Sequence, residues 1–173
     1  MSIEGNRIIL YRLKRSDWPL FKDLYTNPQI MKHVYEPFSD EVAKESFNDR
    51  LVPWCKQSDG WLSFSIRSKQ TNNKIGLIGL KITNHKHMIA EVGYLLCEQA
   101  QGKGFASESL DLIKIYAFKN LNINELTATC STENVASYRL LEKLGFKRKE
   151  RLKSNSTIGG KQIDDYIYTC LVK

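Results

Sequence analysis

The chain has 173 residues, of which 42% are hydrophobic and 26% are charged, as in an ordinary globular protein. Its 26 Lys and Arg residues exceed its 19 Asp and Glu residues, giving a formal charge of +7. This composition argues against an acidic, disordered or collagen-like chain, whereas positive charge alone does not establish a nucleic-acid partner. Because one domain commonly holds about 100–200 residues, we expect a single domain over residues 1–173.

The sequence gives few signals for a membrane, a metal or a disulfide. No apolar stretch approaches the roughly 20 residues of a membrane-spanning helix, and the first residues form no basic-then-apolar leader. We therefore expect a cytoplasmic protein without membrane contact, either a monomer or a homodimer. The cysteines form no C-x-x-C pair or metal-ligand spacing, which predicts reduced, mostly buried thiols and no metal. They are Cys55, Cys97, Cys130 and Cys170.

The first third of the chain predicts one strand followed by three helices. In order, these are a strand over 8–13, a helix over 17–25, a short helix over 28–33 and a helix from residue 40 that bends or ends at Pro53. Ser16, Asn27 and Ser39 precede the three helices. Short polar side chains of this kind accept hydrogen bonds from the first N–H groups of a helix, so each is an expected N-cap.

The middle of the chain predicts an antiparallel meander of three strands. Residues 61–68 alternate between polar and apolar, which is the period of a strand. Turn signals at 71–74 and 84–86 separate this segment from two further strands, over 75–83 and 88–97.

The last third predicts a helix, a strand, a second helix and two closing strands. Apolar residues on one face indicate a helix after the loop at 101–104: Ala106, Leu110, Ile113, Ala117 and Leu121. A strand over 125–131 leads to a helix over 135–144, which Gly145 ends. The residues of that helix expected to face inward are Val135, Tyr138, Leu141 and Leu144. With closing strands over 146–153 and 162–172, the fold class is α+β, a mixed and largely antiparallel sheet flanked by helices.

The loop Gln101-Gly102-Lys103-Gly104-Phe105-Ala106-Ser107 has the composition of an anion site. Glycines let a backbone approach a ligand closely, and the first N–H groups of a helix have no helical partner. Together with the helix dipole and the charge of Lys103, these donors favour a phosphate. The loop lacks the Gly-Lys-Ser/Thr of a Walker motif and the parallel opening of a dinucleotide fold. A plain turn between a strand and a helix is the alternative.

Three motifs together carry a family resemblance. They are Ala90-Glu91-Val92-Gly93-Tyr94, the loop motif Gln101-x-x-Gly104-x-Ala106, and Glu133-Asn134-Val135-Ala136-Ser137 followed by Leu141-Glu142-Lys143-Leu144-Gly145-Phe146. The chain resembles the GCN5-related N-acetyltransferase (GNAT) superfamily over almost its whole length, and most of all the Rim-type N-terminal acetyltransferases of ribosomal proteins. The resemblance implies transfer of an acetyl group from acetyl-CoA to an amine, on a sheet in which one pair of strands splays apart to bind CoA.

The resemblance also implies the residues that contact acetyl-CoA. The backbone N–H groups from Gly102 to Ser107 would hold the pyrophosphate, and a backbone N–H near Leu95 or Leu96 would steady the thioester oxygen. Asn134 would bind the pantetheine amides. The full implied set is Leu95, Leu96, Gln101, Gly102, Lys103, Gly104, Phe105, Ala106, Ser107, Asn134 and Ser137.

The reaction requires a neutral amine, so a base must take its proton. Glu91 is the first candidate base and Glu36 the second, and a structural or solvated carboxylate is the alternative for each. Both are expected to contact the acceptor, and Tyr35 is expected to form a wall beside them. Many relatives place a tyrosine acid at the position of Leu141, so Ser137 is the candidate that orients or protonates the sulfur. A thiolate leaves readily because a free thiol has a pKa of about 8.5.

Three functions remain open at this point. The leading one is acetylation of a protein N-terminal α-amine. The second is acetylation of a small amine, either a spermidine-like polyamine or an aminoglycoside, and the third is a non-catalytic module that binds acyl-CoA. The stretch from Arg139 to Lys153 holds seven Lys or Arg residues. It is either a solvated face or a surface that contacts CoA phosphates or the ribosome.

Overall fold

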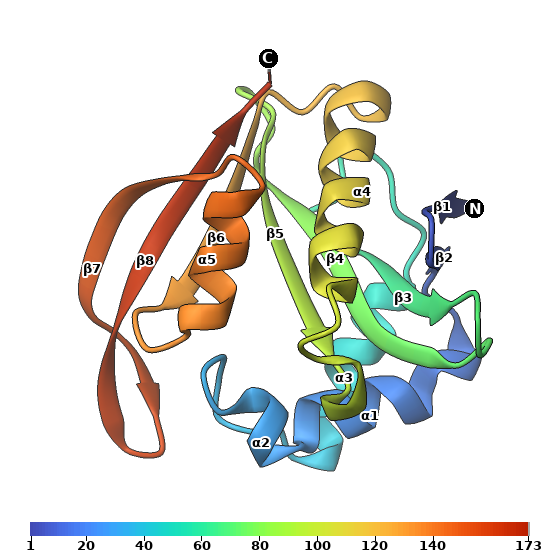
Figure 1. The fold of residues 1–173 in the computed structure, drawn as a ribbon, viewed down its shortest axis with the longest axis horizontal. Coiled ribbons are helices and arrows are strands. Elements are labelled where there is room, and N and C mark those ends of the chain that lie inside the picture. Colours follow the sequence, from blue (N-terminus) through green and yellow to red (C-terminus); the bar gives the residue numbers. More distant parts are fainter. Residues whose placement is uncertain (173) are drawn as a thin grey trace.

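One eight-stranded sheet passes through the protein, and helices cover both of its faces (Figure 1). The computed structural model describes residues 1–172. The strands are β1 (Ser2–Glu4), β2 (Ile8–Arg12), β3 (Leu62–Ser68), β4 (Lys74–Asn84), β5 (Ile89–Leu96), β6 (Glu125–Ser131), β7 (Lys147–Ile158) and β8 (Lys161–Leu171). The helices are α1 (Trp18–Thr26), α2 (Pro28–Met31), α3 (Asp40–Leu51), α4 (Phe105–Asn120) and α5 (Val135–Lys143), with 3₁₀ turns at Arg15–Asp17 and Glu98–Ala100. This architecture confirms the α+β class with a mixed sheet.

The order of strands across the sheet is β1-β2-β3-β4-β5-β6-β8-β7. Among the described strands, β5 and β6 are the one parallel pair, and α4 forms the crossover between them. Their pairing covers only Ile89–Glu91 against Glu125–Thr127. Beyond Glu91 the two strands part, while β5 stays paired with β4 as far as Leu96. The splayed pair expected from the resemblance is therefore present.

Two hydrophobic cores lie on opposite faces of the sheet. The first packs the sheet against α4 and α5 and includes Val92 and Leu96 of β5. The second packs the other face against α1 and α3 and includes Leu95. Successive side chains of a strand point to opposite faces. Residues 91, 93 and 95 of β5 therefore face α1–α3, whereas residues 92, 94 and 96 face α4 and α5.

The alternating pattern of β3 does not mark a face exposed to water. Phe64 and Ile66 belong to the core beneath α4, and Ser63 and Ser65 are buried on the opposite face. One cause is Arg50 of α3, which donates to the Ser63 hydroxyl at 3.3 Å. A polar residue in a strand can thus be covered when a helix brings it a hydrogen-bond partner.

The start of the first helix differs from the prediction. Ser16 does not cap it, because the chain first makes a 3₁₀ turn and α1 begins at Trp18. The buried carboxylate of Asp17 accepts from the Lys14 backbone N–H at 2.9 Å and pairs with Lys74 at 2.7 Å. These bonds stabilise the turn in place of the expected cap.

The other helix boundaries depend on local signals, and most were predicted correctly. Asn27 accepts from the N–H of Gln29 at 2.8 Å, and Ser39 accepts from the N–H of Val42 at 3.3 Å, as N-caps do. The short helix ends at Met31 rather than His33. The longer one ends at Leu51, before Pro53. The three-residue β1 carries too little pattern to be detected in the sequence.

Three expectations for the rest of the chain need correction. The segment 154–161, expected as a loop, continues the β7–β8 hairpin, which turns at Gly159 and Gly160 with φ of 58° and 73°. Irregular pairing between Leu152 and Ser156 breaks the alternation that would have revealed it. Val135, expected to face inward, is 40% exposed because it opens α5 at the helix end. Of the four free thiols only Cys130 is fully buried.

Gly145 follows α5 with φ of 87°, a left-handed conformation that glycine adopts at low cost, and it ends the helix as expected. No helix within residues 1–172 has the length and apolarity needed to cross a membrane.

Candidate functional site

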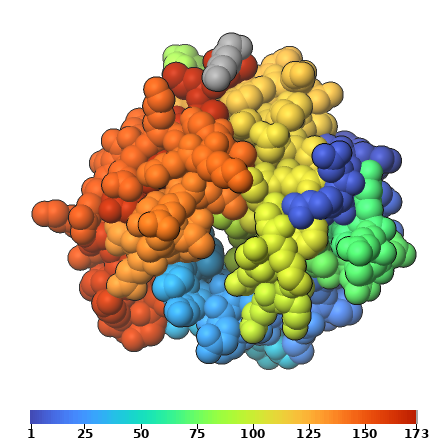
Figure 2. All heavy atoms as spheres, viewed as in Figure 1, coloured from blue at the N-terminus to red at the C-terminus, as the bar shows by residue number. Residues whose placement is uncertain are grey.

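The candidate site begins where β5 parts from β6. From Val92 to Leu96 the β6 side of β5 has no strand partner in the described chain. Figure 2 shows a hollow on this face, bordered by the segments of α5, the start of α4 and α2. Unpaired strand N–H and C=O groups can bond an extended ligand in the way that an added strand would. The split therefore suits a long, narrow molecule with amide groups.

The glycine-containing loop lies at one end of this split. Gly102 and Gly104 have φ of 72° and 81°, which other residues rarely adopt. Gly104 precedes α4 and, lacking a side chain, gives the helix no side-chain cap, so the first N–H groups of α4 remain available to a ligand. The Gln101 side chain donates to the carbonyl oxygen of Leu96 at 3.1 Å and ties the loop to β5. The phosphate site expected from the sequence stays a prediction, and this geometry leaves room for it.

Arg7, between β1 and β2, clamps the loop from behind. Its guanidinium donates to the Lys103 carbonyl oxygen at 2.9 Å and to the Glu108 carboxylate at 3.0 Å, and its backbone N–H donates to Glu108 at 2.7 Å. It also lies 4.7 Å from the ring centroid of Phe105. In a trans peptide the C=O and N–H point in opposite directions. Arg7 therefore turns the N–H of Gly104 away from itself, toward the other side of the loop.

Sequence analysis missed Arg7. It lies 96 residues from Lys103, outside every motif considered above. No local pattern in the sequence signals a hydrogen bond over that separation.

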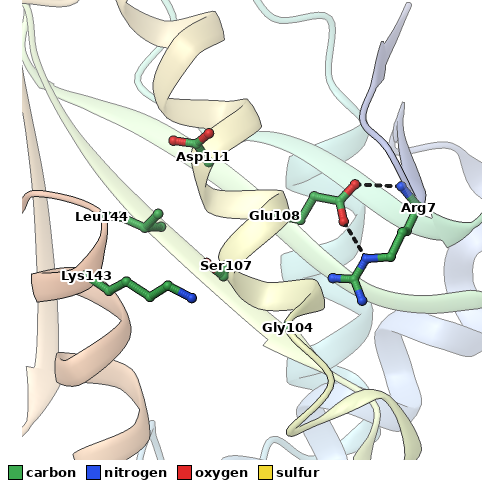
Figure 3. A pocket seen from close by; sticks show the side chains of 7 residues that line it. All are labelled: Arg7, Gly104, Ser107, Glu108, Asp111, Lys143 and Leu144. Carbon is green, nitrogen blue, oxygen red and sulfur yellow. Dashed lines mark hydrogen bonds and ion pairs between the residues drawn. The ribbon is translucent and has the colours of Figure 1, made fainter.

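A cavity of about 330 Å³ opens beside the loop (Figure 3). Its lining residues are Arg7, Gly104, Ser107, Glu108, Asp111, Lys143 and Leu144. Its two carboxylates are engaged, Glu108 with Arg7 and Asp111 with Lys114 at 3.0 Å. Lys143 extends its ammonium from α5 into the opening. Lys143 is thus the cation of the lining that has no ion pair in the described chain, and its charge suits a phosphate.

The two faces of β5 carry different chemistry. Glu91 is half-buried on the α1–α3 face, and Lys81 is its cross-strand partner on β4. Burial raises the pKa of the Glu91 carboxyl, and this rise is opposed by a hydrogen bond with Thr129 and by the charge of Lys81. Nearby, Trp61 covers Gly93, with ring atoms 3.5 Å from the place where a Cβ would stand. Glu91 is thus a carboxylate held in a partly dry environment.

Tyr94 lies on the opposite face of β5, toward α5. Its hydroxyl donates to the Ser137 hydroxyl oxygen at 3.2 Å, and burial raises the pKa of Tyr94. The backbone N–H of Ser137 donates to the Asn134 side-chain oxygen at 3.2 Å, so Asn134 caps α5 and its NH₂ group remains for a ligand. The Ser137 oxygen thus accepts a hydrogen bond, and its own hydrogen can be donated to a neighbouring acceptor, which in the described chain includes the Cys130 sulfur. Sequence reasoning missed Tyr94, although strand alternation places it opposite Glu91.

The remaining candidates lie around the opening of the α1–α3 face. Glu36 is exposed, and its carboxylate accepts from the Gly159 backbone N–H, which joins the segment after α2 to the β7–β8 hairpin. Tyr35 is 56% exposed. Its pKa is raised, first by partial burial of the phenol and next by the charge of Glu91, with Asp165 contributing less. Tyr35 therefore lies within electrostatic range of Glu91 and Asp165, whereas the Glu36 carboxylate is already bonded to Gly159.

The basic stretch from residue 139 to 153 is not uniformly free. Arg148 lies 3.8 Å from the Tyr166 ring centroid and donates to the Tyr168 hydroxyl. Two further members pair with acids, Lys149 with Glu125 and Arg151 with Asp164. The exposed members without an ion pair in the described chain are Arg139, Lys143, Lys147 and Lys153. Residues 1–172 contain no cluster of three side chains that could ligate a metal.

Comparison with known proteins gives concordant matches. The family model described as an acetyltransferase (GNAT) domain matches residues 7–147. The chain is 29% identical over 166 residues to the uncharacterized N-acetyltransferase p20 of Bacillus licheniformis, covering 95% of this chain and 93% of that protein. It is 27% identical over 162 residues to a spermidine N(1)-acetyltransferase of Vibrio cholerae, covering 92% and 90%. The crystal structure of spermidine N-acetyltransferase from Vibrio cholerae in complex with CoA and spermine superposes with a TM-score of 0.85, at 26% identity and 96% coverage of each chain.

The Arg7 clamp makes a specific prediction about the donor. We expect Arg7→Ala to raise the KM for acetyl-CoA about tenfold, the scale of losing a charge-assisted hydrogen bond, with little change in kcat. The KM for S-acetylpantetheine, which lacks the phosphates, should not change. Steady-state kinetics with both donors measure the difference.

Two further variants separate the clamp from other roles of Arg7. Glu108→Gln keeps the Arg7 charge but weakens the clamp, so it should also raise the KM for acetyl-CoA. Lys69→Ala removes an exposed ion pair with Glu4 on the same end of the sheet and should change neither KM. Equal losses with both donors would mean that Arg7 supports the fold in general rather than the phosphate loop.

Proposed function

The chain belongs to the GNAT family of acetyltransferases, and from that premise we propose that its acceptor is a protein N-terminal α-amine, as in the Rim-type branch. The enzyme uses acetyl-CoA as its acetyl donor. We further propose that the amine attacks the thioester directly. The observation that carries this mechanism is the placement of Glu91 and the Tyr94–Ser137 pair on opposite faces of β5, at the point where β5 leaves β6.

The residues present fit acetyl-CoA. In our proposal the loop N–H groups from Gly102 to Ser107 bind the pyrophosphate, and Lys143 approaches the outer phosphate. The unpaired edge from Val92 to Leu96 bonds the pantetheine arm. A backbone N–H at Leu95 or Leu96 would stabilise the oxyanion that develops on the thioester. The donor thus supplies an activated acetyl group, and the chain supplies its position.

Glu91 acts as the base on the α1–α3 face. As the bond from nitrogen to the acetyl carbon forms, the proton of the amine passes to the Glu91 carboxylate, directly or through one water. Burial raises the pKa of Glu91, and a carboxylate with a raised pKa is a stronger proton acceptor. On the other face, Ser137 offers its hydroxyl hydrogen to the departing sulfur while Tyr94 donates to the Ser137 oxygen.

The strength of this base favours an α-amine. A protein α-amine has a pKa of about 7.7–8.0, whereas an aliphatic amine such as lysine has a pKa of about 10.4. At neutral pH the neutral fraction of an α-amine is therefore larger by a factor of roughly several hundred. A single carboxylate therefore has to deprotonate a smaller fraction of such an acceptor. The proposal includes Tyr35 as the wall of the opening.

A polyamine acceptor is the second candidate. The spermidine acetyltransferases named above favour it, and so do the carboxylates of Glu91 and Asp165, which would attract a cation. Acetylation of a panel of amines separates the two candidates. We expect release of CoA to be fastest with N-terminal peptides of ribosomal proteins and slower with spermidine or an aminoglycoside. A clear preference for spermidine would contradict the proposed acceptor.

The pH dependence of turnover should report Glu91. Because the base must be ionised, kcat/KM should rise as pH increases through the raised pKa of Glu91, above the pH expected for an exposed glutamate. Lys81→Gln removes a positive charge that stabilises the carboxylate, so the rise should move to higher pH.

Carboxamide variants identify the base. Glu91→Gln should lower kcat by about 10²–10⁴, the usual contribution of a general base, and should leave only the rise of kcat/KM that follows deprotonation of the amine, near its own pKa of about 7.7–8.0. Glu36→Gln replaces the carboxylate that accepts from the Gly159 N–H with a neutral amide and should keep the rise of kcat/KM assigned to Glu91. If Glu36→Gln loses this rise of kcat/KM and Glu91→Gln keeps it, Glu36 rather than Glu91 is the general base.

Contact with the ribosome is also part of the proposal. It rests on the exposed residues Arg139, Lys147 and Lys153, which carry no ion pair in the described chain. If they bind ribosomal RNA, the logarithm of the affinity should fall linearly with the logarithm of salt concentration. A flat profile between low and physiological salt would exclude this partner.

A further inference from the structure

A second cavity of about 330 Å³ opens on the α1–α3 face. Its lining residues are Ser46, Asp49, Arg50, Asp59, Gly60, Trp61 and Lys81. It adjoins the candidate base, because Lys81 is the cross-strand partner of Glu91, and such partners have Cβ atoms about 4.5–5.5 Å apart. Trp61 also covers Gly93, two residues beyond Glu91 on the same face. An acceptor whose amine meets Glu91 can therefore extend into this cavity.

Arg50 is a half-buried cation without an acidic partner. Its Nε is buried and has no hydrogen-bond partner, and within residues 1–172 no carboxylate forms an ion pair with it. The guanidinium lies 5.0 Å from the Trp61 ring centroid, 5.4 Å from that of Tyr25 and 5.5 Å from that of Phe21. These rings favour the cation and fix its plane. Nη1 also donates to the Ser63 hydroxyl at 3.3 Å, so a carboxylate in the cavity would meet the remaining Nη hydrogens of the guanidinium.

The two carboxylates of the cavity lie at its outer rim. Asp59 is 95% exposed and bonds His85 at 3.1 Å, and Asp49 is exposed on α3. Arg50, Trp61 and Lys81 are half-buried and form the inner wall. The deeper part of the cavity therefore carries positive charge, and the rim carries negative charge.

Acidic and basic groups both act on Tyr35 at the opening of the α1–α3 face. Glu91 and Asp165 raise the pKa of Tyr35, whereas Arg50 lowers it, so Tyr35 lies within range of both signs of charge. Asp165 is 4% exposed and accepts from Asn155 at 2.8 Å and from Ser156, so it keeps its place without a cation. Both signs of charge are therefore present around the opening.

We propose that the cavity lined by Arg50, Trp61 and Lys81 binds a carboxylate of the acceptor, so that the acceptor carries an amine and an acid on the same molecule. The inference rests on the proposed function and specifies its substrate. The amine lies at Glu91 and the carboxylate at Arg50. The carboxylate comes from an acidic side chain near a protein N-terminus or from the α-carboxylate of a small amino-acid-like amine. A polyamine offers Arg50 no partner.

Matched acceptors test this inference. The first arm compares Ala-Glu-Ala-Ala-amide with Ala-Gln-Ala-Ala-amide, and then moves the acidic residue to the third and fourth positions. The second arm compares the dipeptide Ala-Ala with its amide, which isolates an α-carboxylate. We expect kcat/KM to favour the acid by about tenfold in at least one pair, as expected for a charge-assisted bond. Equal rates within every pair would overturn the proposal.

Variants of the cavity show whether Arg50 causes the preference. Arg50→Gln should abolish the ratio of acid to amide rates, and Arg50→Lys should retain part of it. Arg67→Gln is the matched control, because Arg67 also stacks on an aromatic ring, Tyr11, and has a buried Nε without a partner, but lies outside the cavity. It should keep the full ratio. The ratio is measured within one preparation, so a loss of folded enzyme cannot mimic the result. Persistence of the preference in Arg50→Gln would contradict the proposal.

A binding measurement separates failure of this inference from failure of the proposed function. The indole resonance of Trp61, assigned with Trp61→Phe, is followed while the N-acetylated Glu and Gln peptides are titrated in the presence of CoA. Only the acidic peptide should shift it, and Arg50→Gln should remove the shift. A shift without turnover would support the carboxylate site and contradict the proposed acetylation. Turnover in which neither the Trp61 shift nor the rate distinguishes acid from amide would support the proposed acetylation and contradict the carboxylate site.

Discussion

The short pairing between β5 and β6 is the constraint on which the rest of the site depends. Three residue pairs join the strands, and then β5 continues along β4 while β6 turns away. A strand edge inside a protein needs hydrogen-bond partners, because unpaired backbone groups are costly when buried. The edge from Val92 to Leu96 is therefore a place for a ligand. Alternation along the same strand places Glu91 and Tyr94 on opposite sides of that ligand.

Local signals in the sequence were sufficient for most of the fold. Asn27, Ser39 and Gly145 act within a few residues, so their caps and stops could be predicted. The glycine loop was found for the same reason. Contacts between distant segments left no such signal, because nothing near Arg7 indicates that it bonds a carbonyl 96 residues away. The bond from Gly159 to Glu36, across 123 residues, was equally hidden.

The residues of the candidate site also differ in whether a local signal in the sequence could reveal them. Glu91 and Ser137 were selected from motifs, and the structure places them on elements that flank the split. The sequence predicts no role for Tyr94, because only the structure shows that its hydroxyl on β5 reaches Ser137 of α5. Nothing in the sequence marks Arg50, since an arginine in a helix is ordinary until its aromatic surroundings are known. The net charge of the sequence likewise does not show where the charged side chains lie on the folded surface.

The basic composition of β7 has a consequence for the whole molecule. An open sheet has two edges, and each edge strand offers free backbone groups to which a second molecule can add a strand. One edge of this sheet is β1, only three residues long. The other is β7, twelve residues long and largely exposed, with Lys147, Lys149 and Lys153 along it. Pairing two such edges would bring lysines of both copies together. Their repulsion would oppose such pairing, so the lysines of β7 disfavour growth of the sheet from this edge.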